Sequence, residues 1–159
     1  MPIIEIKENV QFSFGDGLTM VNNQVFSTLG QITKCKLLVY SNAKLILGDN
    51  VAMSNTTIVA TKEISIGNKV MIGGGVTIVD SDFHSMNADN WFTLKDEIEM
   101  ISLPVKIGNN VFIGMDSIIL KGVSIGNNVR IAAASVVTQN IPDNQIWGGN
   151  PAKFIKEIQ

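Results

Sequence analysis

The chain of 159 residues is poor in cysteine and histidine, and each scarcity excludes a kind of protein. Cys35 is the only cysteine, so no intrachain disulfide can form. His84 is the only histidine, which excludes a zinc site built from three histidine ligands, and we expect no bound metal. The residues near Met1 do not form the charged and then apolar segments of a secretory signal. We therefore expect a cytoplasmic protein.

Charge of one sign and long apolar runs are also missing. The chain carries 12 basic and 14 acidic residues with no long run of either, which predicts no nucleic-acid partner and no anionic membrane surface as partner. Its longest apolar runs are far shorter than the ~20 residues of a membrane span, so we expect no span. With 45% hydrophobic residues the chain can build one core, and we expect a single domain over residues 1–159.

What the sequence has in abundance is a repeat of six residues. Between residues 105 and 137, two series of side chains recur at that spacing. The first series is aliphatic and consists of Ile107, Ile113, Ile119, Ile125, Ile131 and Val137. The second lies two places earlier, is small or β-branched, and consists of Val105, Val111, Ser117, Val123, Val129 and Ser135. Side chains two places apart point to one face of a strand, so each repeat should turn two side chains inward.

The same repeat occurs upstream, with an irregularity between Gly48 and Gly67. These glycines are nineteen residues apart rather than eighteen, so one extra residue must be absorbed at a corner or bulge. Six residues make one short strand and one turn, and three such faces close a triangular coil, which predicts an all-β parallel β-helix. A β-sandwich would not keep a strict six, because its turns vary in length. The period does not determine the handedness, and parallel crossovers are otherwise right-handed.

Three regions depart from the repeat. Residues 1–44 are less regular, and we expect irregular N-terminal coils whose phenylalanines cover the open end of the core. Residues 80–104 interrupt the repeat with a polar loop, and long insertions of this kind are usually functional. Residues 141–159 contain Pro142, Gly148, Gly149 and Pro151, and we expect this tail to leave the β-helix and end in a short helical extension. Trp147 is expected to pack the tail against the coils.

The run IGNNVFIGMDSIILKGVSIGNNVRIAAASVVTQNIP followed by GGNPAKFIKEI, within residues 107–158, resembles the hexapeptide-repeat acyltransferases. The closest resemblance is to the galactoside, maltose and surface-polysaccharide O-acetyltransferases. It implies a left-handed β-helix assembled as a homotrimer, with acetyl-CoA bound in the groove between adjacent subunits. It also implies acetyl transfer from acetyl-CoA to a hydroxyl of a sugar or polysaccharide precursor.

The resemblance also implies which residues bind acetyl-CoA. The backbone of Ala133 and its neighbour Ala132 would contact the pantetheine arm, and Thr138 would lie near the adenine end. Backbone amides near Gly114 and Met115 would steady the oxyanion of the tetrahedral intermediate, although Met115 departs from the family pattern of a small polar residue. Two further positions carry basic residues for the CoA phosphates, namely Lys153 and Lys156.

The polar loop contains His84, and the segment DSDFHSMN resembles the part of the polysaccharide-modifying members that carries the general base. The chemistry fits, because an attacking hydroxyl must lose a proton near neutral pH, where imidazole titrates. We expect Asp80 or Asp82 to orient the ring or to accept a hydrogen bond from the sugar, and Asp82 is interpreted as a substrate contact. Two further residues are interpreted as substrate contacts, Trp91 through its flat face and Asn55 through its amide.

Other functions carried by this fold are weighed against acetyl transfer. A sugar nucleotidyltransferase would need a further nucleotide-binding domain, for which the chain has no room. A purely structural or ice-binding β-helix would need a flat ladder of threonines, which Thr56, Thr57 and Thr61 do not form. The alternative that stays open is a sugar-nucleotide N-acyltransferase, which differs only in having an amine as acceptor.

Overall fold

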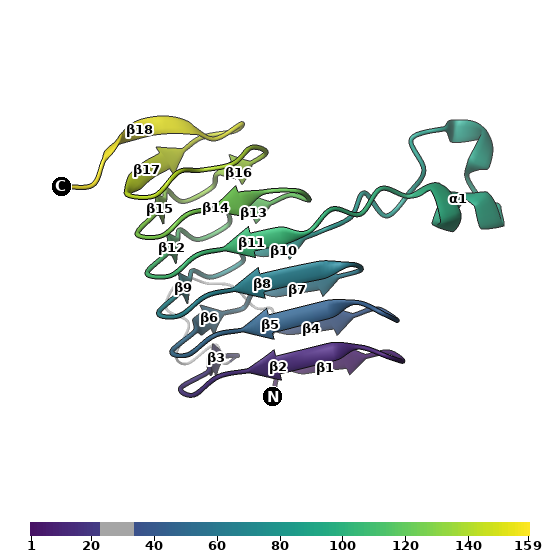
Figure 1. Ribbon diagram of the computed structural model, residues 1–159, viewed down its shortest axis with the longest axis horizontal. Coiled ribbons are helices and arrows are strands. Elements are labelled where there is room, and N and C mark those ends of the chain that lie inside the picture. The colour runs from purple at the N-terminus through teal and green to yellow at the C-terminus, as the bar shows by residue number, and fades with distance from the viewer. Residues whose placement is uncertain (23–33) are drawn as a thin grey trace.

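The computed structural model describes residues 1–22 and 34–159, and these form a stack of triangular coils (Figure 1). Three sheets make the three faces of the stack, and within each the strands of successive coils pair in parallel. Sheet A contains β1 (Ile3–Ile6), β4 (Lys36–Val39), β7 (Thr57–Ala60), β10 (Thr77–Val79), β13 (Ile118–Ile119) and β16 (Val136–Val137). Sheet B contains β2 (Gln11–Phe14), β5 (Lys44–Leu47), β8 (Glu63–Ile66), β11 (Val105–Ile107) and β14 (Ser124–Ile125).

Sheet C contains β3 (Thr19–Val21), β6 (Ala52–Ser54), β9 (Met71–Ile72), β12 (Phe112–Ile113), β15 (Arg130–Ile131), β17 (Gln145–Gly148) and β18 (Lys153–Glu157). The chain passes from sheet A to B to C and back to A, so each coil has an A–B, a B–C and a C–A corner. In Figure 1 the chain climbs from purple to yellow while the strands of sheet B, nearest the viewer, run toward the left. The β-helix is therefore left-handed, against the usual preference of parallel crossovers.

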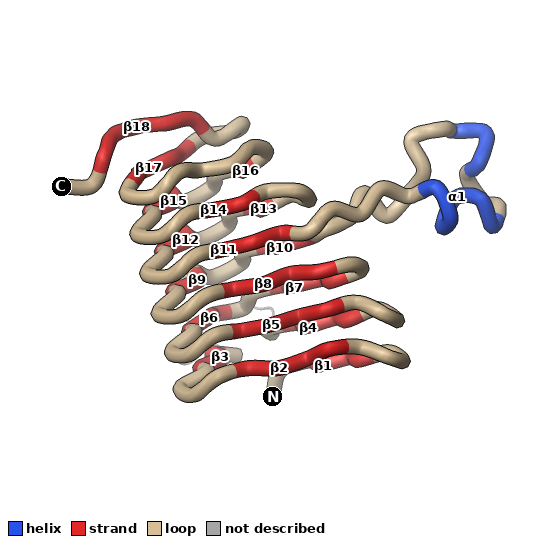
Figure 2. Tube along the Cα trace, in the orientation of Figure 1, coloured by secondary structure: helices blue, strands red, loops and turns tan. Residues whose placement is uncertain are grey.

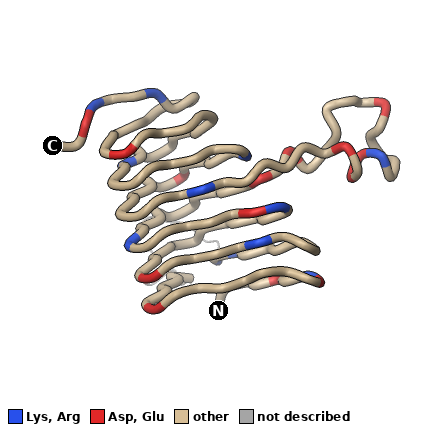
Figure 3. Tube along the Cα trace, viewed as in Figure 1, with Lys and Arg blue, Asp and Glu red and all other residues tan. Residues whose placement is uncertain are grey.

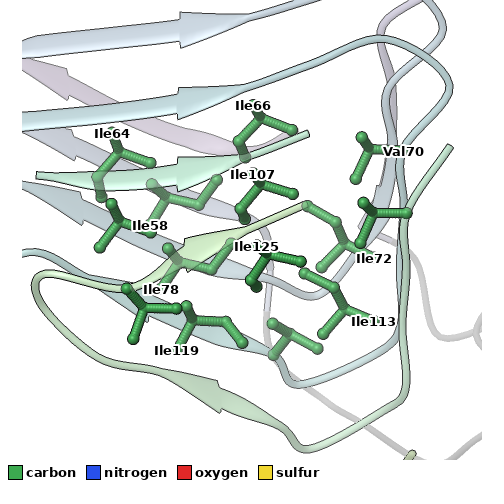
Figure 4. Packing of buried hydrophobic residues seen from close by; sticks show 14 of the residues in the cluster. Ile58, Ile64, Ile66, Val70, Ile72, Ile78, Ile107, Ile113, Ile119 and Ile125 are labelled. Atoms are coloured by element: carbon green, nitrogen blue, oxygen red, sulfur yellow. The ribbon is translucent and has the colours of Figure 1, made fainter. Parts of the chain in front are cut away.

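The interior is filled by columns of aliphatic side chains that stack from coil to coil (Figure 4). Every second residue of a strand points inward and meets its register partner in the next coil, as Ile72 meets Ile113 and Ile113 meets Ile131. The repeat of six therefore predicted the inward register correctly, and Ile113 and Ile125 are both buried. Removal of these columns from water is the main driving force for forming the coils.

The B–C corner explains the recurring Gly-Asn-Asn of the sequence. The glycine is needed because coils stack closely: a Cβ on Gly108 would lie 2.7 Å from the carbonyl oxygen of Gly126. The first asparagine joins the coils, since Asn109 N donates to Asn127 Oδ1 at 2.9 Å and Asn127 N donates to Asp143 Oδ1 at 2.7 Å. The second turns the chain with a positive φ, 56° at Asn110, which asparagine tolerates better than most residues.

The spacing of nineteen residues between Gly48 and Gly67 results from changes in length at two corners. Register shows that the A–B corner between Thr57 and Ser65 has two residues more than the equivalent corner between Ile118 and Ser124. The C–A corner between Ala52 and Thr57 has one residue fewer than the equivalent corner between Phe112 and Ile118. The net excess is one residue, as the glycine spacing required, and the wide A–B corner lies directly beneath the inserted loop.

The C-terminal tail differs from the prediction of a helical extension. β17 pairs in parallel with β15 and continues sheet C, and β18 folds back antiparallel to β17. The expected helix is wrong because a segment this short gains little as an isolated helix, whereas the edge of β17 offers backbone partners to a strand. Trp147 is the register partner of Ile131 and is 9% exposed, so it covers the end of the core, as the packing interpretation required.

The N-terminal end is more regular than expected, because β1, β2 and β3 form a complete coil paired with the next one. Its inward side chains lie at the open end of the stack, where Phe12 packs partly against the core and Phe14 is 58% exposed. Residues 34–44 of the predicted irregular coils also follow the coil, with β4 paired to β1 and β7, while residues 23–33 lie outside the described residues. Within the described residues no helix is long and apolar enough to cross a membrane.

Candidate active site

The loop between β10 and β11 is an arm that leaves the A–B corner and projects away from the stack (Figure 1). The arm holds a 3₁₀ turn η1 (Ala88–Asn90) and a single α-helix, α1 (Leu94–Glu99), which are the two helices of the described chain (Figure 2). Thr93 caps α1, because its hydroxyl accepts a hydrogen bond from Lys95 N at 3.2 Å. The arm is thus a structured element that presents side chains beyond the body of the β-helix.

His84 lies on this arm with its ring oriented by a carboxylate. Asp96 Oδ2 is 2.8 Å from His84 Nδ1, and Asp96 Oδ1 accepts a hydrogen bond from Ser85 N at 2.7 Å. A carboxylate only accepts, so in the neutral ring Nδ1 carries the proton and Nε2 keeps its lone pair. The imidazole is 71% exposed, whereas the carboxylate of Asp96 is 14% exposed. The arrangement therefore presents an oriented imidazole base to solvent.

The hydrogen bond from His84 also holds the pKa of the Asp96 carboxyl below its ordinary value, and the amide of Ser85 adds to the effect. Asp96 is accordingly ionised near neutral pH and stays an acceptor. The sequence did not indicate this residue, because Asp96 is twelve positions from His84 in an insertion without a repeat. Only its place in the first turn of α1 brings the two side chains together.

The prediction that Asp80 or Asp82 orients the ring is wrong. Asp80 is fully buried, and its carboxylate accepts hydrogen bonds from the backbone of Thr61 at the A–B corner below. Asp82 pairs instead with the ammonium of Lys121 at 2.7 Å, at the root of the arm. Both carboxylates therefore attach the arm to the coils. Neither contacts the imidazole ring of His84, because each is already bound to a residue of the coils.

Trp91 lies on the arm with His84, and the structure ties it to the same turn. Its indole nitrogen donates to the carbonyl of Ser85 at 2.8 Å, and its side chain is 47% exposed. Ser85 is buried, and its hydroxyl accepts hydrogen bonds from Asn87 N and from the amide group of Asn90. The residues around His84 are therefore held by hydrogen bonds rather than by an apolar core.

A second set of predicted residues meets at the C–A corner, in a groove of about 460 Å³ on the outer face of sheet C. Four predicted CoA-binding residues line it: Gly114, Met115, Ala132 and Ala133. Small residues are needed at this corner because the coils approach closely, and a Cβ on Gly114 would lie 2.4 Å from Ala133 N. The apolar part of the wall comes from Met71 and Phe112, which are 59% and 41% exposed.

The remaining predicted residues lie outside this groove. Thr138 and Lys156 are exposed, Thr138 just after β16 and Lys156 opposite Ile146 in β18. Lys153 pairs with Gly148, which stacks over Ala132, so this lysine stands beside the upper end of the groove. The side chain of Asn55 is 2% exposed and lies behind the surface of the same corner.

The two halves of the candidate site lie at opposite ends of sheet A. The chain enters β10 from the C–A corner and leaves it at the A–B corner for the arm, so one chain does not bring His84 to its own groove. The arm also exposes apolar side chains, with Leu94 and Ile98 at 81% and 78% exposure. Charged groups on the arm are mainly acidic (Figure 3). No group of three or more potential metal ligands occurs among residues 1–22 and 34–159.

The chain is similar in sequence and in fold to several acetyltransferases. Residues 104–139 match the family model described as bacterial transferase hexapeptide (six repeats). The chain is 53% identical over 97 residues to Protein CapG of Staphylococcus aureus, which covers 60% of this chain and 54% of that protein. It is 36% identical over 138 residues to the galactoside O-acetyltransferase of Escherichia coli (strain K12), covering 85% of this chain and 66% of that one.

A solved galactoside acetyltransferase in complex with coenzyme A shares the fold, with a TM-score of 0.59 and 27% identity over 99% of this chain and 65% of that one. The chain spans about half to two thirds of the length of the two curated relatives. The matched repeats are the coils that carry the glycine and alanine corner of the groove. The chain therefore belongs to the hexapeptide-repeat acyltransferase family.

Proposed function

We propose that the protein transfers an acetyl group from acetyl-CoA to a hydroxyl of a sugar or polysaccharide precursor, with His84 as the general base. The observation that carries the proposal is the exposed imidazole of His84, oriented through Nδ1 by Asp96 with Nε2 left free to accept a proton. The similarity to a galactoside O-acetyltransferase supports the acyl donor and the class of acceptor.

In the proposed reaction, Nε2 of His84 removes the proton of the acceptor hydroxyl as its oxygen attacks the carbonyl carbon of the thioester. The carbon–sulfur bond of the tetrahedral intermediate then breaks, CoA leaves as the thiolate, and the imidazolium returns the proton to sulfur. Asp96 stabilises the imidazolium while it exists, because the carboxylate is 2.8 Å from Nδ1. The amide of Gly114 already donates to the carbonyl of Ile131 at 2.8 Å, so the backbone amide of Met115 would stabilise the oxyanion.

The active site of the proposed enzyme is shared between copies in a homotrimer. The support is geometric, since the arm and the groove lie at opposite ends of sheet A within one chain. The exposed Leu94 and Ile98 of the arm, together with Met71 and Phe112 beside the groove, are apolar surfaces that a neighbouring copy would cover. An arm of one copy placed against the groove of the next would complete the site.

Acetyl-CoA is proposed to lie along the groove between copies. The small corner formed by Gly114, Ala132 and Ala133 lets the pantetheine arm approach the backbone, and Lys153 beside it suits a phosphate. Thr138 near the adenine end and Lys156 near a phosphate remain predictions, as does the contribution of Met115.

The acceptor is proposed to bind beside His84 on the arm. Trp91 presents a half-exposed ring on which a pyranose could stack, and Asp82 stands at the root of the same arm. Asn55 stays a predicted polar contact. The protein is expected in the cytoplasm, because a chain with a single cysteine needs no oxidising compartment to form an intrachain disulfide.

The experiment is release of CoA from acetyl-CoA against a panel of hydroxyl sugars, amino sugars and nucleotide sugars. His84→Ala should lose roughly 10²–10⁴-fold in kcat while folding normally, because a general base typically supplies that factor. Asp89→Asn is the matched control, since its carboxylate lies on the same arm and makes no hydrogen bond to the histidine. Turnover by a folded His84→Ala protein at the wild-type rate would remove the histidine from the mechanism. Acetylation of amino sugars alone would identify an N-acyltransferase instead.

A further inference from the structure

The arm is attached to the β-helix through a narrow neck, in which two segments run antiparallel. Ser81 and Ser102 form an isolated bridge, Asp82 N donates to Ile101 O at 3.1 Å, and Leu103 N donates to Asp80 O at 2.9 Å. The orientation of everything on the arm, His84 included, therefore depends on how this neck is held.

A buried carboxylate and three hydroxyl groups connect the neck to the coil below. Asp80 is fully buried and accepts hydrogen bonds from the hydroxyl and amide of Thr61, each at 2.8 Å, and from the amides of Lys62 and Glu63 at 2.8 and 2.7 Å. Thr61 Oγ1 lies 2.9 Å from Ser102 Oγ, which lies 3.0 Å from Ser81 Oγ.

The chain of hydroxyls ends at the backbone of the residue before the histidine. Phe83 N donates to Ser81 Oγ at 3.0 Å. Because a carboxylate only accepts, the hydroxyl of Thr61 donates to Asp80. The hydroxyl of Ser81 lies between Ser102 Oγ and Met100 Sδ, at 3.0 and 3.6 Å. Linked hydrogen bonds of this kind polarise and strengthen one another.

Phe83 itself has a backbone conformation that phenylalanine rarely adopts. Its φ is 63°, in the left-handed region, where a bulky side chain is strained. Such strain persists only where the surroundings enforce it, and it concentrates at functional sites. Here the amide of Phe83 is held by Ser81, and the preceding residue, Asp82, is held by Lys121.

We propose that the hydroxyl chain of Ser81, Ser102 and Thr61, terminated by Asp80, holds the strained turn at Phe83 and thereby positions the imidazole of His84. Ser102 is the central positioning residue, since its hydroxyl joins the two sides of the neck. This inference rests on the proposed function only where it predicts an effect of substitutions in the chain on kcat. The positioning of His84 is a structural property that can be measured without any reaction.

The first test replaces the central hydroxyl. Ser102→Ala should lower kcat roughly tenfold or more, because a displacement of about 1 Å can cost up to 10²-fold. KM for acetyl-CoA should change by less than about twofold, since the groove lies at another corner. A fall in kcat without a change in KM would show that the substitution affects the chemical step and not the binding of acetyl-CoA. Ser102→Thr, which keeps the hydroxyl, should restore most of the rate. Ser65→Ala is the matched control, a half-buried serine facing outward on sheet B.

The second test does not depend on activity. The chain has one histidine, so its imidazole gives a single set of NMR signals. In Ser102→Ala these signals should move toward those of a free histidine and lose the restricted motion of the wild type, and in Ser65→Ala they should not. Identical imidazole signals and identical kcat in Ser102→Ala and wild type would overturn the proposal. A wild type without acetyl transfer would overturn the proposed function alone, since the NMR comparison still decides the positioning.

A second variant covers the case in which Ser102→Ala fails to fold. Phe83→Gly removes the strain and should fold at least as stably, because glycine adopts positive φ freely. It should nevertheless loosen His84 and lower kcat, whereas Lys69→Gly, at φ 55° on the B–C corner, should leave both unchanged. If Phe83→Gly keeps the wild-type imidazole signals and rate, the turn does not position the histidine.

Discussion

At the scale of single residues, the contact between Asp96 and His84 distinguishes this histidine from an ordinary solvated one. The imidazole is mostly exposed, yet its Nδ1 is engaged by a carboxylate that is itself held by Ser85 N. An exposed side chain loses rotamer freedom when it is fixed in this way, and the pairing must offset that entropy. The arm therefore presents an oriented imidazole at its surface rather than a buried pocket.

Replacement of Asp96 by asparagine should separate orientation from basicity. In Asp96→Asn the amide can donate to Nδ1, which favours the wrong tautomer, so kcat should fall by roughly 10- to 100-fold, less than for loss of the base itself. KM for acetyl-CoA should stay near the wild-type value. Steady-state kinetics with a responsive acceptor would measure both. Unchanged kcat in Asp96→Asn would show that the ring needs no such partner.

The lowered pKa of Asp96 also predicts how the arm responds to acid. A carboxyl with a lower pKa in the folded state contributes stability above its unfolded value, about 3.9, and this contribution is lost as pH falls through the folded value. The arm should therefore loosen below about pH 4, and Asp96→Asn should lack this dependence. The NMR signals of His84 across pH 3–6 would report it. Identical acid responses in the two proteins would count against the pairing.

At the scale of elements, each strand is too short to be stable alone and gains its partners from the coils above and below. The inward columns and the Asn–Asp corner act together, because the first supplies apolar burial and the second fixes the rise from coil to coil. The arm is stabilised differently, since its contacts are mainly hydrogen bonds of polar side chains rather than buried apolar side chains. Elements of this kind open at lower free energy than a packed core.

Core truncation should therefore cost far more than a change at the groove. Ile113→Ala and Ile125→Ala should each lower the free energy of unfolding by ~2–5 kcal/mol through lost contacts and a cavity. Met115→Ser should cost less than about 1 kcal/mol, because Met115 is only half-buried at the corner, where surface changes are mild. Denaturant titration of the three variants would measure the difference. Isoleucine variants as stable as the wild type would place these residues outside the core.

At the scale of the whole molecule, one chain keeps the arm and the groove apart. The arm and the groove lie at different corners, and both present apolar side chains to solvent. Copies related by rotation would each place their arm against the groove of the next copy. A cyclic trimer would satisfy all three arms and all three grooves in this way.

Sedimentation should accordingly give three times the chain mass of 17.2 kDa. Leu94→Ser combined with Ile98→Ser should weaken the assembly and lower turnover together, because both side chains would lie at the contact. Lys95→Ala, on the same helix, is the matched control. A monomer at micromolar concentration that still consumes acetyl-CoA would exclude a shared site.

The sequence by itself determined the β-helix, its inward register and the corners, because a strict period of six allows only one way to bury two side chains per repeat. It also indicated His84 as the candidate base, since a single histidine in a polar insertion resembles the base of a known family. Asp96, the hydroxyl chain and the final strand were decided by tertiary structure. Asp96 meets His84 across an insertion without periodicity, and β18 forms because the edge of β17 offers hydrogen bonds that a short isolated segment lacks.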